Sequence, residues 1–144
     1  MRALFALLCV VLLGGCAVFR KAPEPSDWVA PADAPFLGGE VAHRAAAVLP
    51  VAATTVVVEA KTPADGQLPS VLSEEVVAAL RATGFAVAED AGVHGRRLRF
   101  DAFPVGGDVL LHVEIDGIRA SRLYARSEDG RLEPASALTV RTTR

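Results

Sequence analysis

Two stretches of the chain repeat apolar residues at helical spacing. The stronger pattern covers residues 69–83, with Arg81 in its last turn and Gly84 where a left-handed C-terminal cap is needed. A shorter helix is predicted over residues 36–49, and Pro50 ends it. The apolar stripe of the stronger helix consists of Leu72, Val76, Ala79, Leu80 and Thr83.

Alternating apolar and polar residues predict strands in the rest of the chain. The β-branched stretch at residues 54–61 forms the first strand, and a short strand at residues 85–89 follows the main helix. Strict alternation marks residues 97–104 and 108–116, which the glycine pair at 106–107 joins as a hairpin. A slip by one residue would bury the charged side of these strands, so their register is well specified.

The C-terminal part leaves one choice open. Either Asp116 and Gly117 form a second tight turn, or a bulge lets the strand continue to residue 126. A final strand at residues 132–142 contains Pro134, which indicates a sheet edge. The sequence predicts an α+β fold: an antiparallel sheet of four to five strands with one main helix packed on a face, preceded by a short helix and a Pro-rich tether.

An apolar run at residues 3–13 precedes this folded part. It has the length of a secretory signal, since a transmembrane helix needs about 20 residues. Two glycines and then Cys16 follow, with Leu13 three places before the cysteine, a pattern similar to the cleavage site of bacterial lipoproteins. We expect cleavage between Gly15 and Cys16, loss of residues 1–15, and attachment of lipid, including palmitate, to Cys16.

The residues next to each cysteine indicate which cysteine is the lipidation site and which membrane holds the anchor. Cys9 is a poor second site, because Leu8 precedes it where a small residue is needed. Ala17 follows Cys16, where aspartate is common in lipoproteins kept at the inner membrane, so the resemblance implies an outer-membrane anchor that faces the periplasm. The alternatives are an ordinary signal peptide and a helix that happens to contain Cys16. After lipidation no cysteine remains for a disulfide or a metal.

Residues 16–36 are predicted to be the lipidated cysteine and a Pro-rich tether, and residues 37–144 a small periplasmic domain. Extended Pro-rich chain spans roughly 3 Å per residue. The only tryptophan, Trp28, lies in the tether. We favour Trp28 as an anchor that docks on a partner protein; contact with the lipid interface and packing on its own domain stay open.

Net charge and composition limit the classes of function and the kind of core that the sequence supports. The formal charge of −2 becomes −3 when Arg2 leaves with the signal, which argues against nucleic-acid binding. The local cluster of Arg96, Arg97 and Arg99 is interpreted as a solvated strand face. Aromatic residues make up 6% of the chain, so aliphatic side chains should build the core.

Catalytic signatures are absent from the sequence. The glycine pairs lack the spacing and the lysine of a phosphate-binding loop, and no serine stands in a nucleophile elbow. His43, His94 and His112 fall on three different elements, and Glu114 and Asp116 share a strand face that we expect to be solvated. We therefore predict no enzyme activity, cofactor, metal site or small-molecule substrate.

Four motifs together resemble one family, and their order covers nearly the whole chain. They are Cys16, the helix-to-strand corner at residues 80–87, Ser121-Arg122-Leu123-Tyr124, and Pro134-Ala135-Ser136-Ala137. The chain is similar to TrbH, a small lipoprotein of conjugative transfer operons. Phe85 and Leu138 stand where this pattern leads us to expect tyrosine and a bulkier aromatic residue.

The resemblance implies a non-enzymatic part of the mating-pair formation apparatus, a type IV secretion system used in conjugation. Its partners would be the membrane, through the N-terminal lipid, and other proteins of the transfer channel. The alternative is a general cell-envelope lipoprotein that acts in assembly or ligand binding. Gene neighbours discriminate between these two, and an enzyme would require a polar cluster in a pocket.

Overall fold

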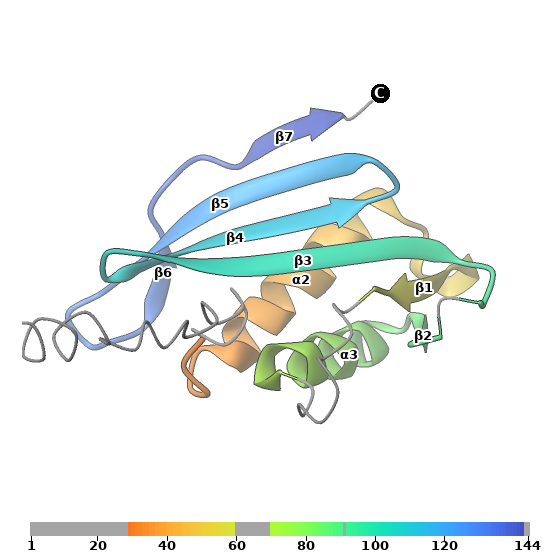
Figure 1. The fold of residues 1–144 in the computed structure, drawn as a ribbon, viewed down its shortest axis with the longest axis horizontal. Coiled ribbons are helices and arrows are strands. Elements are labelled where there is room, and N and C mark those ends of the chain that lie inside the picture. The colour runs from red at the N-terminus through yellow and green to blue at the C-terminus, as the bar shows by residue number, and fades with distance from the viewer. Residues whose placement is uncertain (1–28, 60–69, 91, 143–144) are drawn as a thin grey trace, which may run out of the picture.

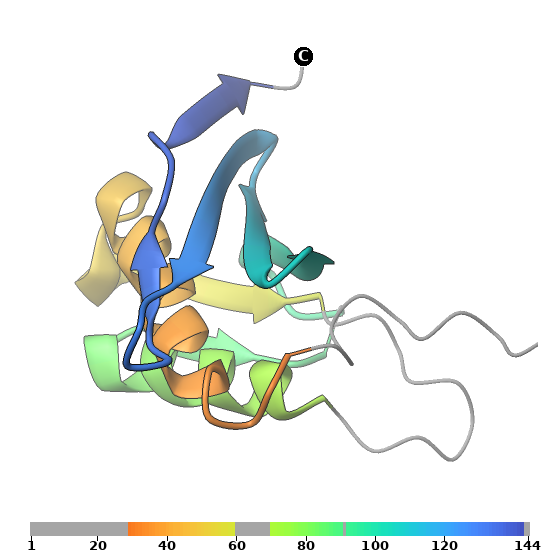
Figure 2. The same cartoon turned by 90° about the vertical axis from the view of Figure 1, so that its left-hand side faces the viewer.

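Two helices lie side by side on one face of a seven-stranded sheet (Figures 1 and 2). The computed structural model describes residues 29–59, 70–90 and 92–142 of the chain. Among these residues the α-helices are α2 (Ala34–Val48) and α3 (Val71–Thr83), and a short 3-10 helix covers Val51–Ala53. The strands are β1 (Thr55–Val58), β2 (Ala86–Ala88), β3 (Arg96–Val105), β4 (Asp108–Ile115), β5 (Ile118–Arg126), β6 (Leu132–Pro134) and β7 (Thr139–Thr142). The α+β class is therefore confirmed.

The sheet is mixed, and this corrects the predicted antiparallel sheet of four to five strands. Its order is β2-β1-β3-β4-β5-β6, and β7 also pairs with β5. β1 is parallel to both β2 and β3, whereas the other pairs are antiparallel. For β1 and β2 the reason is the connection: α3 follows β1 and precedes β2, and a helical crossover joins strands that run in the same direction.

α3 has the ends that its sequence predicts. Ser70 caps its start, accepting a hydrogen bond from the Ser73 N–H over 3.2 Å. Gly84 adopts φ 103° at its end, and the Phe85 N–H returns to the Leu80 carbonyl over 3.1 Å. The helix begins at Val71 rather than at the predicted residue 69, because Ser70 is used as the cap.

α2 is longer than the short helix predicted. It begins at Ala34, inside the segment assigned to the tether, because proline is compatible with the first helical turn and Pro35 occupies that turn. Leu37, Val41 and Ala45 are fully buried on the side that faces the sheet and α3. α2 therefore contributes to the core as α3 does.

Tight turns join the antiparallel strands. Val105 pairs with Asp108 across the predicted glycine turn. Ile115 pairs directly with Ile118, which leaves Asp116 and Gly117 as a two-residue turn with φ 47° and 80°. The hairpin is therefore the correct alternative, and β5 is a separate strand.

The core lies between the helices and the sheet, and Tyr124 is its largest fully buried side chain. The inward positions predicted on β3 and β4, such as Leu98 and Val113, are buried. Val57, predicted to face the opposite way from Val56, is buried as well. Gly95 lies against it, since a Cβ at Gly95 would be 2.8 Å from the Val57 side chain.

Candidate interaction surface

The face of the sheet opposite the helices carries a row of charged side chains across five strands. Register places Arg99 beside Glu114, Glu114 beside Arg119, and Arg119 beside Arg141. Arg99 also donates to Glu59, which directly follows β1. We call Glu59, Arg99, Glu114, Arg119 and Arg141 the charge row. Its signs run negative, positive, negative, positive, positive from β1 to β7.

The carboxylates of the row lie inward and the arginines outward. The Glu59 side chain is 14% exposed and accepts hydrogen bonds from both Arg97 and Arg99, whose side chains are 62% and 61% exposed. The hydrogen bond from Arg99 lowers the pKa of Glu59 below its ordinary value, burial opposes this shift, and Arg97 adds to it. Arg119 binds Glu114 at 2.7 Å. The surface that solvent meets is therefore dominated by guanidinium groups.

Beyond Asp101, His112 and Ser121, which follow the charge row along the strands, the open face is apolar. Register aligns Phe103, Leu110 and Leu123 across β3, β4 and β5, and all three are half-buried. The ring of His112 meets the edge of the Phe103 ring at a centroid distance of 5.3 Å. Thus His112, predicted to face outward, lies beside an aromatic side chain.

Polar contacts join β5 to the start of α2. The Tyr124 hydroxyl donates to Glu40 over 2.6 Å, and Arg44 binds the same carboxylate oxygen over 3.1 Å. The Arg126 guanidinium donates hydrogen bonds to both carboxylate oxygens of Asp33, over 2.7 and 3.2 Å. Burial, then the hydrogen bond with Glu40, raises the pKa of Tyr124 to about 12.

This junction was not predicted from the sequence. Two of its residues are distinctive in the sequence: Tyr124 is the only tyrosine, and Asp33 stands directly before a helix. No sequence pattern shows that positions 84 and 93 residues apart in the chain meet.

Two of the family motifs contact each other. Between β6 and β7 the chain leaves the ladder, and there the Leu123 N–H donates to the Ser136 hydroxyl over 3.0 Å. The Ala135 N–H donates to the Leu123 carbonyl over 2.9 Å, and the Arg122 side chain donates to the Ser136 carbonyl over 3.0 Å. Ser136 thus takes the place of the strand residue that would bond to Leu123 if the final strand were continuous. The predicted sheet edge is confirmed.

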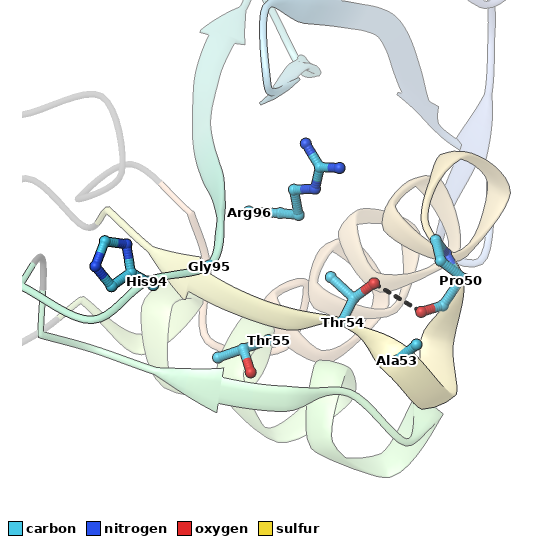
Figure 3. Close-up of a pocket in the computed structure, with 7 residues that line it drawn as sticks. All are labelled: Pro50, Ala53, Thr54, Thr55, His94, Gly95 and Arg96. Atoms are coloured by element: carbon cyan, nitrogen blue, oxygen red, sulfur yellow. Dashed lines mark hydrogen bonds between the residues drawn. The ribbon is translucent and has the colours of Figure 1, made fainter.

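A shallow depression of about 530 Å³ lies where α2 gives way to β1 (Figure 3). Its lining comes from the segment after α2 and from the residues that lead into β3; Thr54 donates to the Pro50 carbonyl over 2.7 Å. It is lined by Pro50, Ala53, Thr54, Thr55, His94, Gly95 and Arg96. His94 is the single ordinary acid–base group there, so the lining offers no pair for catalysis.

The residues predicted for cleavage, lipid attachment and partner docking lie outside the described residues; they are Gly15, Cys16 and Trp28. Within residues 29–59, 70–90 and 92–142, His, Cys, Asp and Glu side chains form no group of three that could hold a metal ion. Across the same residues, neither helix is long and apolar enough to cross a membrane.

The described part of the chain is a small α+β unit in which several ion pairs connect neighbouring elements and whose open sheet face carries basic and apolar zones. The model of the family described as conjugal transfer protein TrbH matches residues 19–143. The chain therefore belongs to the TrbH family of conjugal transfer proteins, as its motifs indicated. No curated protein and no solved structure matches it.

Proposed function

We propose that this protein is an outer-membrane-anchored structural lipoprotein of a conjugative type IV secretion apparatus, without enzymatic activity. The match to the TrbH family over residues 19–143 carries the proposal, because it makes the chain a component of conjugal transfer. The lipoprotein cleavage pattern at Cys16 supports the anchor. Together they describe a part held at the envelope and in contact with other transfer proteins.

The way in which the described residues use their charges supports a structural role. The ion pair of Asp33 with Arg126 holds β5 against the first turn of α2, and Glu59 forms ion pairs with two arginines of β3. These pairs stabilise the relative positions of elements. An enzyme instead needs titratable groups aimed at a site that a substrate can enter.

Substitution of Cys16 tests the anchor, and Cys9 provides a matched control within the same chain. The Cys16→Ser variant should lose palmitate label and leave the outer-membrane fraction, whereas Cys9→Ser should retain both. Conjugation frequency should fall with Cys16→Ser at equal protein level. Labelling of Cys16→Ser at the level of the unsubstituted protein would show that the lipid is attached elsewhere.

A clean deletion of the gene tests the role in transfer. We expect conjugation to fall and to recover when the full chain is restored in trans. Normal conjugation in the deletion strain would refute the proposed function.

Trp28 is proposed as a docking residue for a partner protein. It directly precedes Val29, which packs against the core, so it occupies the junction between tether and folded unit in the sequence. Trp28→Ala should lower the conjugation frequency while Trp28→Phe retains most of it, because binding in a docking pocket depends on the aromatic surface that is buried. Membrane fractionation unchanged in both variants separates this role from lipid contact.

A further inference from the structure

β7 lies at an edge of the sheet, and among the described residues its outer side has no neighbour. It pairs only with β5, and all four of its residues are exposed. Three of them, Thr139, Val140 and Thr142, are β-branched and favour an extended backbone. Figure 2 shows β7 at the end of the sheet, beyond the helices. An exposed edge of this kind is a template for another strand.

Hydrogen bonding shows which groups of β7 point outward. Leu123 directs its N–H and C=O toward the segment that joins β6 and β7. Strand alternation gives Arg119 and Ser121 the same direction, so their partners Arg141 and Thr139 bond to β5. Val140 and Thr142 consequently point their N–H and C=O groups away from the sheet.

The charge row indicates what a neighbouring strand would carry. Arg141 lies directly opposite Arg119, and Arg119 is already paired with Glu114. Within the described residues Arg141 has no carboxylate partner. Like charges opposite each other destabilise a sheet, whereas an acidic side chain on the next strand would compensate Arg141.

The opposite face of β7 favours an apolar neighbour. Val140 lies on the helix side of the sheet, in register with Ala120, yet its side chain is 57% exposed. A side chain from an added strand would cover it.

We propose that β7 accepts an extended segment of another protein as an additional strand, with an acidic side chain beside Arg141 and an apolar side chain beside Val140. The backbone groups of Val140 and Thr142 supply the main-chain hydrogen bonds, and the two faces supply selectivity. The inference rests on the proposed function only for the class of partner, which is another protein of the transfer apparatus. A second copy of this chain fits poorly, because it would bring another Arg141 to the same edge.

Photo-crosslinking in donor cells tests the proposal with the full chain in its own operon. A photoreactive residue replaces Thr142, at the edge, and separately Arg131, which is exposed in the turn before β6. We expect Thr142 alone to crosslink to a transfer protein. Mass spectrometry should map the bond to an extended segment that contains Asp or Glu.

Two backbone variants separate strand addition from ordinary surface contact. Val140→Pro removes an outward N–H and keeps every bond to β5, so the fold should persist while the crosslink falls about tenfold. Val140→Ile keeps both the N–H and a β-branched apolar side chain, so it should crosslink normally.

Arg141→Glu separates charge recognition from folding. It should lower the crosslink, yet the thermal stability should stay equal or rise, because glutamate opposite Arg119 replaces a like-charge pair. A lower crosslink with lower stability would contradict the charge argument.

The inference is overturned if Val140→Pro and Val140→Ile crosslink equally, if the product is a second copy or a lipid, or if Thr142 yields no product. Failure of the proposed function is a separate result, namely normal conjugation after gene deletion. If the crosslink then still falls with Val140→Pro but leads to an envelope protein outside the transfer apparatus, the assignment of β7 as the binding edge stands.

Discussion

At Gly38 the two helices approach each other closely, and substitution of this residue tests how they pack. A Cβ added to Gly38 would lie 2.9 Å from the carbonyl carbon and oxygen of Glu75 and 3.1 Å from the Val76 nitrogen. These atoms belong to the backbone of α3, so they cannot turn aside as a side chain can. Gly38→Ala therefore requires α2 and α3 to separate.

The next residue provides a matched control. A Cβ at Gly39 meets no atom within 4 Å, and the position is exposed. Replacing glycine by alanine inside a helix stabilises by about 1 kcal/mol at either position. Overpacking a closely packed contact costs about 1 to 3 kcal/mol. Helix propensity cancels in the comparison, so Gly38→Ala should be about 1 to 3 kcal/mol less stable than Gly39→Ala.

Urea unfolding of the detergent-solubilised full chain, followed by far-ultraviolet circular dichroism, measures this difference. We expect the midpoint to rise for Gly39→Ala and to fall for Gly38→Ala relative to Gly39→Ala, with equal slopes. Equal midpoints for the two variants would refute the close approach of α2 and α3 at Gly38.

Three further outcomes follow from local geometry. Gly84→Ala should lower the free energy of unfolding by about 1 kcal/mol in urea titration, because φ 103° strains any side chain, and an unchanged midpoint would contradict the left-handed cap. Tyr124 is the only tyrosine, so alkaline absorbance titration should show ionisation near pH 12 in the folded protein; its stabilising contribution is present below about pH 10 and is lost as the pH rises toward the folded pKa. Ionisation near pH 10 in the folded chain would contradict the burial of its hydroxyl. Glu59 has a lowered pKa, so its contribution is present above about pH 4 and is lost as the pH falls through the folded pKa. Glu59→Gln should therefore destabilise the protein at neutral pH and match the unsubstituted protein in acid, and an equal deficit at both pH values would argue against the ion pairs.

Local patterns predicted much of the fold, because they depend on neighbours in the chain. The cap at Gly84 needs only a helix that ends there, and the hairpin turn at Gly106 needs only two alternating strands. The parallel arrangement of β1 was missed, because a strand pattern alone carries no direction. Its register with β3 is what brings Glu59 to Arg97 and Arg99.

The candidate surfaces show the same division. Outward positions for Arg97, Arg99 and Glu114 were predicted by alternation, whereas their order in a row depends on which strands are neighbours. The edge was predicted from Pro134, and the structure divides it between β6 and β7, because Ser136 bonds to Leu123 where the ladder is interrupted.

The sequence by itself determined the lipoprotein pattern at Cys16, the order of most elements and membership in the TrbH family, since each is written in neighbouring residues or short motifs. Only the tertiary structure decided that Tyr124 meets Glu40, that Gly38 meets the backbone of α3, and that Arg141, at the end of the charge row, has no carboxylate partner among the described residues. These features join residues far apart in the chain. Their energies depend on distance, register and burial, which exist only once the helices have packed on the sheet.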